Sequence, residues 1–170
     1  MVSAPNTVWA GDMTYIQTEE GWLYLAVVLN LFSRRIVGWS MGATIDAALA
    51  CRALEMAWQQ RQPDRGLIFH SDRGSQYASG RYAELLRGRG IKASMSRKGN
   101  CWDNACSETL FGSLKVERLH GEQFKTHREG KDAVLDWLLW YNRSRMHSTL
   151  NYLSPAQFEQ QAEAQHALAA

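Results

Sequence analysis

The sequence is poor in cysteine and proline and has no long hydrophobic run. Its 170 residues include three cysteines and three prolines. An odd, sparse set of cysteines does not form a disulfide framework, and so little proline argues against a disordered or fibrous chain. No apolar run reaches the roughly 18 residues of a membrane-spanning helix, and the first residues lack a secretion signal. We therefore expect one domain of ordinary size, cytoplasmic and without a membrane partner.

Positive charge is concentrated in the middle third of the chain. The net charge of the whole chain is only +2. Residues 81–131 carry 11 Lys and Arg against 6 Asp and Glu, whereas residues 1–80 carry 6 against 7 and residues 132–170 carry 2 against 4. Such a basic segment is either a solvated face or a nucleic-acid contact, and charge alone leaves both open.

The order of the predicted elements indicates an α/β protein. Runs of β-branched and aromatic residues with short turns predict antiparallel strands over 8–17, 22–31 and 35–44. Helical spacing predicts a helix over 47–62 that Asp46 caps. The remaining elements are strands at 66–71 and 91–95 and helices at 79–87, 103–118 (capped by Asp103), 128–142 and 154–167. This order matches the ribonuclease H-like fold, with a five-stranded mixed sheet (three antiparallel strands, then two more) flanked by helices.

Three carboxylates lie at positions in the predicted strands and helices that could form one site. Asp12 lies in the middle of the first strand, where an aspartate is disfavoured and costly to bury unpaired. Asp72 follows the fourth strand, and Glu108 lies early in the third helix. If the first and fourth strands are neighbours, the three carboxylates meet, and such a cluster needs a cation. Oxygen ligands suit Mg²⁺ or Mn²⁺, and two such ions can activate an attacking oxygen and stabilise a leaving one.

Two of the three carboxylates also have a ready structural explanation. Asp72 has the residue type of a turn, and Glu108 has the residue type of an exposed helix position. Asp12 is the hardest of the three to explain as structure alone.

A zinc site at Cys101 and Cys106 is disfavoured, because structural zinc takes four ligands and no second pair is present.

The third helix is predicted to carry a cation on the face of its carboxylate. At about 100° per residue, Asn104, Glu108 and Lys115 fall within roughly 40° of one another. This face therefore offers a carboxylate to a metal and, two turns on, an ammonium group to a phosphate.

The loop before this helix is basic. It contains Arg97, Lys98 and Asn100, whose cations and amide suit a nucleic-acid backbone. Trp102 either stacks on a base or packs as a hydrophobic staple at the helix start.

These segments together resemble a known family. The resemblance rests on four stretches, NTVWAGDMTYI, GWLYLAVVLNLFSRRIVGW, HSDRGSQY and SRKGNCWDNACSETLFGSLKVE, and on the closing YNRSRMHSTLNYLSPAQF. They are similar to the catalytic domain of bacterial insertion-sequence transposases of the IS-three group, itself similar to the retroviral integrase core. The signature of that family is two aspartates, 35 intervening residues and a glutamate, with a basic residue seven positions later. Asp72, Glu108 and Lys115 have this spacing.

The resemblance implies a DDE-type polynucleotidyl transferase that acts in DNA transposition. Asp12, Asp72 and Glu108 would hold two divalent ions for cleavage at the element end and for attack of the new 3′-hydroxyl on another phosphodiester. Lys115 would position DNA. Supporting residues around the metals or the DNA would be His70, Ser71, Gly74, Gln76 and Asn104. His70 is equally readable as a core histidine, and no tyrosine is expected to act as a nucleophile.

The resemblance also bears on domains and partners. It covers about residues 5–158, so we expect a catalytic core over 1–158 and a helical tail over 159–170. Relatives read the inverted repeats with an N-terminal helix-turn-helix region, and we expect that region to be separate from this chain or missing. Two DNA ends must be joined, which implies a homodimer or higher oligomer on DNA. Asn30 departs from the aspartate more usual in relatives, outside the metal triad, so we expect little effect on the chemistry.

Two other functions remain compatible with the sequence. The carboxylate triad alone permits a ribonuclease H-like nuclease that acts on hybrid or branched nucleic acid. The missing reader region permits a non-catalytic transposase remnant that serves as a DNA-binding module.

Overall fold

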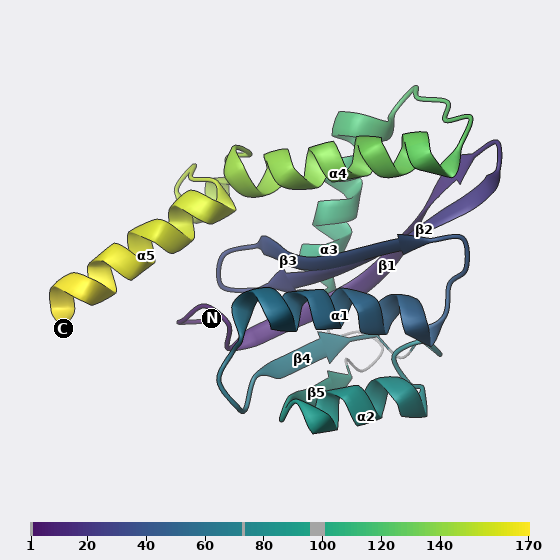
Figure 1. Ribbon diagram of the computed structural model, residues 1–170. Helices are drawn as coiled ribbons and strands as arrows, with labels where there is room; N and C mark the ends of the chain where they lie inside the picture. The colour runs from purple at the N-terminus through teal and green to yellow at the C-terminus, as the bar shows by residue number, and fades with distance from the viewer. Residues whose placement is uncertain (1, 73, 96–100) are drawn as a thin grey trace.

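A five-stranded mixed sheet forms the centre of the computed structural model, which describes residues 2–72, 74–95 and 101–170, without the side chains of 95 and 101–104 (Figure 1). The strands are β1 (Val8–Thr18), β2 (Gly21–Asn30), β3 (Arg35–Gly42), β4 (Ile68–Ser71) and β5 (Lys92–Met95). Their order across the sheet is β3-β2-β1-β4-β5. The first three are antiparallel, and β4 and β5 join as parallel strands. The predicted fold class is confirmed.

Helices cover both faces of this sheet. They are α1 (Ala47–Arg61), α2 (Gly80–Gly88), α3 (Cys101–Leu114), α4 (His127–Arg143) and α5 (Pro155–Ala169), with a π-helical turn at Lys115–Leu119 and a 3₁₀ turn at Ser148–Leu150. Asp46 caps α1, as predicted, because its carboxylate accepts from the Leu49 N–H at 2.9 Å. Among the described residues, none of the helices is both long and apolar enough to cross a membrane.

The start of α3 differs from the prediction. The helix begins at Cys101, so Asp103 lies in its first turn and is not the cap. An acidic residue is favoured at both places, since the unpaired N–H groups and the positive helix end extend over the whole first turn. The α-helical part ends at Leu114, and the π-helical turn continues to Leu119, one residue past the predicted end at 118.

Alternating side chains of the sheet supply two separate cores. Trp9 and Met13 of β1 point to the side of α1 and α2, where they pack with residues such as Leu54. Ile16, an even-numbered residue of the same strand, packs on the opposite side with Leu114 of α3 and its neighbours. Because side chains alternate along a strand, Asp12 belongs to the side of α3.

The last helix is tied to the sheet by one buried carboxylate. Glu159 is 3% exposed and accepts hydrogen bonds from Asn30 Nδ2 at 2.9 Å, Ser33 Oγ at 2.7 Å, Arg35 Nη1 at 2.9 Å and both Nη atoms of Arg61 at 3.0 Å. The boundary expected after residue 158 thus falls inside α5. Beyond Glu159 the helix projects away from the sheet (Figure 1).

Asn30 has a structural reason to differ from aspartate. Its side-chain NH₂ donates to Glu159, and its carbonyl oxygen accepts from the backbone N–H of Asn6 at 3.2 Å. An aspartate at this position would place a second carboxylate against Glu159, which has no proton to donate at neutral pH.

Candidate active site

Asp12 lies in the middle of β1, half-buried on the side of α3. The backbone N–H of Met13 donates to its Oδ1 at 2.8 Å, which fixes the orientation of the carboxylate. Burial raises the pKa of Asp12 to about 6, with the Met13 N–H acting in the opposite direction and the charges of Asp72 and Glu108 adding to the rise. The charges of Asp72 and Glu108 therefore reach Asp12, and the three predicted carboxylates lie in one region of the molecule.

The pairing register of β1 and β4 brings Asp72 close to Asp12. The parallel strands β1 and β4 pair Ala10 with His70, so Asp12 and Asp72 each lie two residues beyond a paired position. Asp72 is exposed, and its Oδ1 accepts from the Gly74 N–H at 2.8 Å. It is thus a turn residue, as the structural reading proposed, and it also lies beside Asp12.

Glu108 comes from α3, whose packing against the sheet directs it. Leu110 and Leu114 of that helix are buried in the core on this side, while Glu108 is exposed. Within residues 2–72, 74–95 and 101–170, no three His, Cys, Asp or Glu side chains are close enough to form a ready-made metal site. The three carboxylates influence one another but do not form a closed coordination shell.

The backbone next to Asp12 requires a glycine, which the sequence reading missed. A Cβ atom at Gly11 would lie 2.9 Å from Phe69 Cε1 and 3.4 Å from Tyr77 Cε1. Tyr77 is buried, and burial raises its pKa well above the usual value, with further contributions from Asp12 and Asp72. The signal in the sequence is the aromatic residue that closes the HSDRGSQY stretch. Tyr77 therefore lies close enough to the two aspartates for their charges to act on its hydroxyl group.

The supporting residues expected from the family resemblance lie around Asp72. Ser71 is buried at the end of β4, and His70 before it is half-buried. A Cβ atom at Gly74 would lie 2.9 Å from Asp72 Oδ1 and 3.2 Å from Gln76 Oε1, so the loop turns tightly here.

The expected DNA-contacting loop lies outside the described residues. This holds for Arg97, Lys98 and Asn100, and for the side chains of Trp102 and Asn104, whose backbone belongs to α3. Their predicted contacts with DNA stay predictions.

Lys115 is the first residue of the π-helical turn, seven positions after Glu108. Its Nζ lies 5.5 Å from the centre of the Tyr15 ring. That ring in turn meets Trp22 edge to face, with ring centres 4.9 Å apart. The sequence predicted a cation at this position but not its aromatic neighbours.

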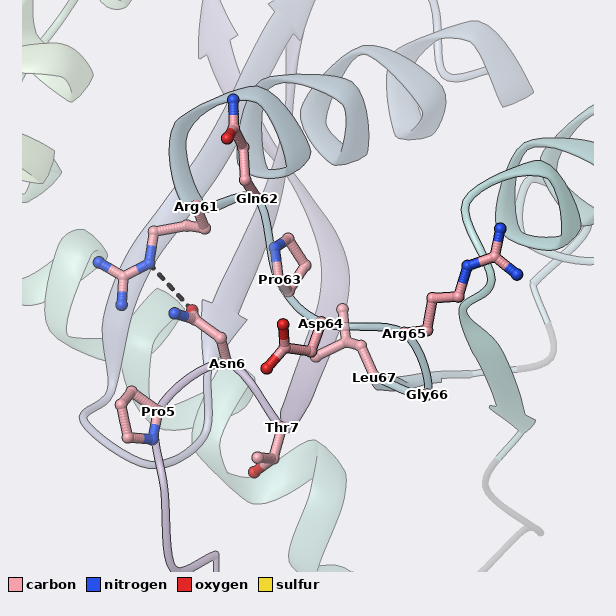
Figure 2. Close-up of a pocket in the computed structure, with 10 residues that line it drawn as sticks. All are labelled: Pro5, Asn6, Thr7, Arg61, Gln62, Pro63, Asp64, Arg65, Gly66 and Leu67. Atoms are coloured by element: carbon pink, nitrogen blue, oxygen red, sulfur yellow. Dashed lines mark hydrogen bonds between the residues drawn. The ribbon is translucent and has the colours of Figure 1, made fainter.

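A separate pocket of about 270 Å³ lies at the other end of β1 and β4 (Figure 2). Thr7, just before β1, and Leu67, just before β4, line it. Arg61 also lines it, and its Nε donates to Asn6 Oδ1 at 2.9 Å (Figure 2). The carboxylates follow the paired parts of these strands and the pocket precedes them, so the pocket does not belong to the candidate active site.

Curated relatives are bacterial transposases. The chain is 51% identical over 158 residues to the transposase InsF of insertion sequence IS3A from Escherichia coli, which covers 92% of this chain and 55% of that protein. It is 48% identical over 158 residues to the transposase of insertion sequence element IS904 from Lactococcus lactis, which covers 92% of this chain and 62% of that protein. The chain thus spans between about half and two thirds of the length of these relatives.

Solved structures with the same fold are retroviral. A chain of the simian T-cell lymphotropic virus intasome superposes with a TM-score of 0.74 at 18% identity, covering 91% of this chain and 54% of that chain. The catalytic core domain of BIV integrase superposes with a TM-score of 0.71 at 17% identity, covering 95% of this chain and 99% of that chain. At these identities the comparison establishes the fold alone.

Family models account for most of the chain. One described as an integrase core domain matches residues 2–101, and a second with the same description matches residues 108–162. The first match alone includes β1, β4 and the two aspartates that follow their paired segments. The chain belongs to the integrase core domain family.

Proposed function

We propose that the chain is the catalytic core of an insertion-sequence transposase. It would cleave DNA and transfer a strand by in-line attack on phosphodiesters, with Asp12, Asp72 and Glu108 as the catalytic residues. The observation that carries this proposal is the placement of the three carboxylates: Asp12 and Asp72 each lie two residues beyond the paired positions Ala10 and His70, and Glu108 lies on α3, which packs on the side of the sheet that Asp12 faces. The identity to bacterial transposases over 92% of the chain supports it.

The donor set fits hard divalent cations. All three groups are carboxylates, and a half-buried Asp12 with two acidic neighbours holds its charge more easily beside a cation. One integrase core of the same fold, that of HTLV-2, was solved in complex with magnesium. Two Mg²⁺ or Mn²⁺ ions would supply activation of the attacking oxygen and stabilisation of the leaving one.

The remaining residues of the site would hold the carboxylates in place and position the DNA. The Met13 N–H holds one oxygen of Asp12 in place, and the tight turn at Gly74 holds Asp72. Lys115 would contact a phosphate of the bound strand, and the loop with Arg97, Lys98 and Asn100 would contact others, since phosphate contacts position a protein on DNA. His70, Ser71, Gln76 and Asn104 would support these groups, and Trp102 would lie against the DNA.

Partners beyond the chain are proposed on the same basis. The HTLV-2 core is recorded in dimeric and trimeric forms, and we propose that this chain also acts on DNA as a dimer or larger assembly. A helix-turn-helix region in a longer or separate chain would choose the element ends.

The experiment compares Glu108→Gln with the unaltered chain in strand cleavage and transfer. The substrates are duplexes that carry the element ends, with supercoiled plasmid as target, in Mg²⁺ or Mn²⁺. We expect the variant to fall to the background of a metal-free reaction. Glu55→Gln, an exposed position of α1 on the other side of the sheet, should keep full activity. Undiminished activity of Glu108→Gln would end the assignment.

Two further measurements separate the alternatives. Cleavage of an RNA–DNA hybrid in preference to duplex ends would favour a ribonuclease H-like nuclease. Failure to bind Mn²⁺ in calorimetry, even with DNA present, would favour a non-catalytic remnant.

A further inference from the structure

Three side chains gather at the edge of β1, past its pairing with β4. They are Tyr15, Trp22 and Lys115, which we call the aromatic edge. Tyr15 is 54% exposed and Trp22 is 48% exposed, although both are large aromatic residues on strands. Lys115 Nζ lies 5.5 Å from the Tyr15 ring centre, and the two rings meet edge to face at 4.9 Å.

Packing of the chain does not account for these exposed rings. Tyr15 follows Trp9 and Met13 on the side of the sheet that α1 covers, and those two residues pack against that core. The part of the sheet that α1 covers ends before Tyr15. Tyr15 belongs to neither described core cluster. Exposed aromatic groups next to a cation are a common form of binding surface for an aromatic ligand that carries negative charge.

The aromatic edge adjoins the candidate active site. Tyr15 lies three residues after Asp12, about 10 Å along the strand. Lys115 lies seven residues after Glu108, about 10 Å along the helix. Both distances equal about three steps of a DNA strand at 3.4 Å each. A strand that leaves the carboxylates therefore reaches the aromatic edge within a few nucleotides.

The route between the two sites crosses an open strand edge. The side chains of Asp12 and Tyr15 point to opposite sides of β1. Among the described residues, β4 pairs with β1 only at Val8–Ala10, so the backbone edge at Met13 is uncovered by a strand. Lys115 spans this edge, since it starts beside α3 and ends over Tyr15.

We propose that the aromatic edge binds an unpaired nucleobase of the strand that leaves the carboxylates. The two rings stand at 76° to each other, so the base stacks on the open face of one ring and meets the other at its edge, and Lys115 contacts the adjacent phosphate. Stacking on aromatic side chains accepts any base, because every base has a π face. The strand is unpaired there, because a duplex with a persistence length of about 50 nm does not turn around a strand edge within about 10 Å. The identity of the ligand as DNA rests on the proposed function.

The charges around the aromatic edge favour this orientation. Glu19 and Glu20 form the turn that precedes Trp22, and both are exposed. Their charges repel a phosphate that approaches this turn. The Lys115 ammonium group, 5.5 Å from the centre of the Tyr15 ring, attracts one, so the phosphate is favoured beside Tyr15.

The test measures DNA affinity without divalent metal, so that no chemistry occurs. The purified chain is titrated with a labelled short duplex that is either blunt or extended by a three-nucleotide single strand. We expect tighter binding of the extended duplex. Tyr15→Leu and Trp22→Leu should each weaken binding of the extended duplex about tenfold, the effect of losing one stacked base, and leave binding of the blunt duplex unchanged.

Two control variants protect this test from a folding artefact. Trp140→Leu removes an equally exposed tryptophan (46%) on α4 and should change neither affinity. Tyr15→Phe keeps the ring and should keep the preference for the extended duplex. Lys115→Gln should weaken both duplexes and lower the salt slope by about one.

The outcomes distinguish this proposal from the proposed function. If Tyr15→Leu and Trp22→Leu bind both duplexes like the unaltered chain, or weaken both equally, the aromatic edge is not a base site and another occupant such as a protein side chain is indicated. If the preference depends on Tyr15 but the chain cleaves no DNA with any metal, the base site stands and the proposed chemistry fails.

Discussion

Arg61 and Glu159 are 98 residues apart in the sequence but form a two-pronged ion pair, with both Nη atoms 3.0 Å from a carboxylate oxygen. Arg61 ends α1, and Glu159 lies near the start of α5. Such a fork geometry is the strong form of a charged hydrogen bond. It connects a helix on one side of the sheet to the final helix, which projects away from the sheet (Figure 1).

Glu159→Gln should lower the free energy of unfolding by about 2–4 kcal/mol. Removing one partner of a buried ion pair leaves uncompensated charge, here on Arg61 and Arg35. The measurement is urea unfolding at neutral pH. Glu163→Gln, one turn further along α5 and exposed, should change stability by less than about 0.5 kcal/mol. Equal stability of the two variants would contradict this role for Glu159.

Asn30→Asp should destabilise the protein at neutral pH and recover in acid. The new carboxylate would replace the amide that donates to Glu159 at 2.9 Å. Two like charges raise the pKa of the pair in the folded state, so the destabilisation of about 1–3 kcal/mol is present above that pKa and disappears as the pH falls and one group is protonated. Unfolding at pH 5 and pH 8 tests it, with exposed Asn151→Asp as control. A penalty that does not change with pH would show that the two carboxylates do not interact.

Gly11→Ala should damage both fold and site. The added methyl group would approach Phe69 Cε1 to 2.9 Å, and relief of that contact must move the strand that holds Asp12. We expect a loss of about 1–3 kcal/mol, as for overpacked cores, and reduced strand cleavage in the folded fraction. The matched control is Gly112→Ala on the exposed side of α3, where a methyl group meets no atom within 4 Å. It should gain about 0.5–1 kcal/mol of stability. A neutral Gly11→Ala variant with full activity would rule out this constraint.

Asp12→Asn should stabilise the metal-free protein above pH 6. Burial, with smaller contributions from Asp72 and Glu108, raises the pKa of this carboxyl to about 6 from 3.8, so stability is lost as the pH rises through that interval and the full cost applies above it. Removing the charge should restore about 1–3 kcal/mol at pH 8 and nothing at pH 3.5. Thermal unfolding at both pH values measures this, with exposed Asp136→Asn as control.

Metal adds a second readout for Asp12. Mn²⁺ should raise the Tm of the unaltered chain at pH 8, since a ligand that binds only the folded state stabilises it. The Asp12→Asn variant should gain less. An equal gain would show that the ion binds elsewhere.

His147 should make the protein sensitive to mild acid. Burial, assisted by the charges of Arg145 and Arg34, lowers its pKa to about 4. Between pH 6.5 and 4 the unfolded chain therefore takes up a proton that the folded chain refuses, so this contribution to stability is complete above pH 6.5 and is lost as the pH falls to 4. His147→Gln should flatten this part of the pH profile in urea unfolding, and exposed His166→Gln should not. A profile that is equally steep in both variants would assign the acid sensitivity to other groups.

Local patterns sufficed for the sheet and for most helix starts. The hairpin of β1 and β2 follows from two apolar strands around a short polar turn, and Asp46 caps α1 as predicted. Ser79, predicted as the first residue of its helix, is the cap of α2. The neighbourhood of β1 and β4, which the site required, is confirmed by their parallel pairing. Asp12 could be selected because an aspartate in a strand interior needs an explanation, and Asp72 and Glu108 could be selected because their spacing matches the family signature.

Other features depend on contacts between distant segments. Glu159 reads as part of a polar helical tail, because its partners Asn30, Arg35 and Arg61 lie about 100 residues or more away in the sequence. Tyr15 reads as a buried strand residue, because alternation gives its side of the sheet but not where α1 stops covering it. The length of a covering helix is a property of the tertiary structure, and no pattern within β1 reports it.

The pairing of Ala10 with His70 has a consequence for how metal affinity and folding are linked. The distance between Asp12 and Asp72 is set by backbone hydrogen bonds of adjacent parallel strands, and a slip of one residue would send one of the two side chains to the opposite side of the sheet. Affinity for a divalent ion would therefore not decline gradually as the protein loosens. It would be lost in one step with this strand pair, so a bound-metal signal recorded during denaturation would report the melting of the sheet centre separately from the outer helices.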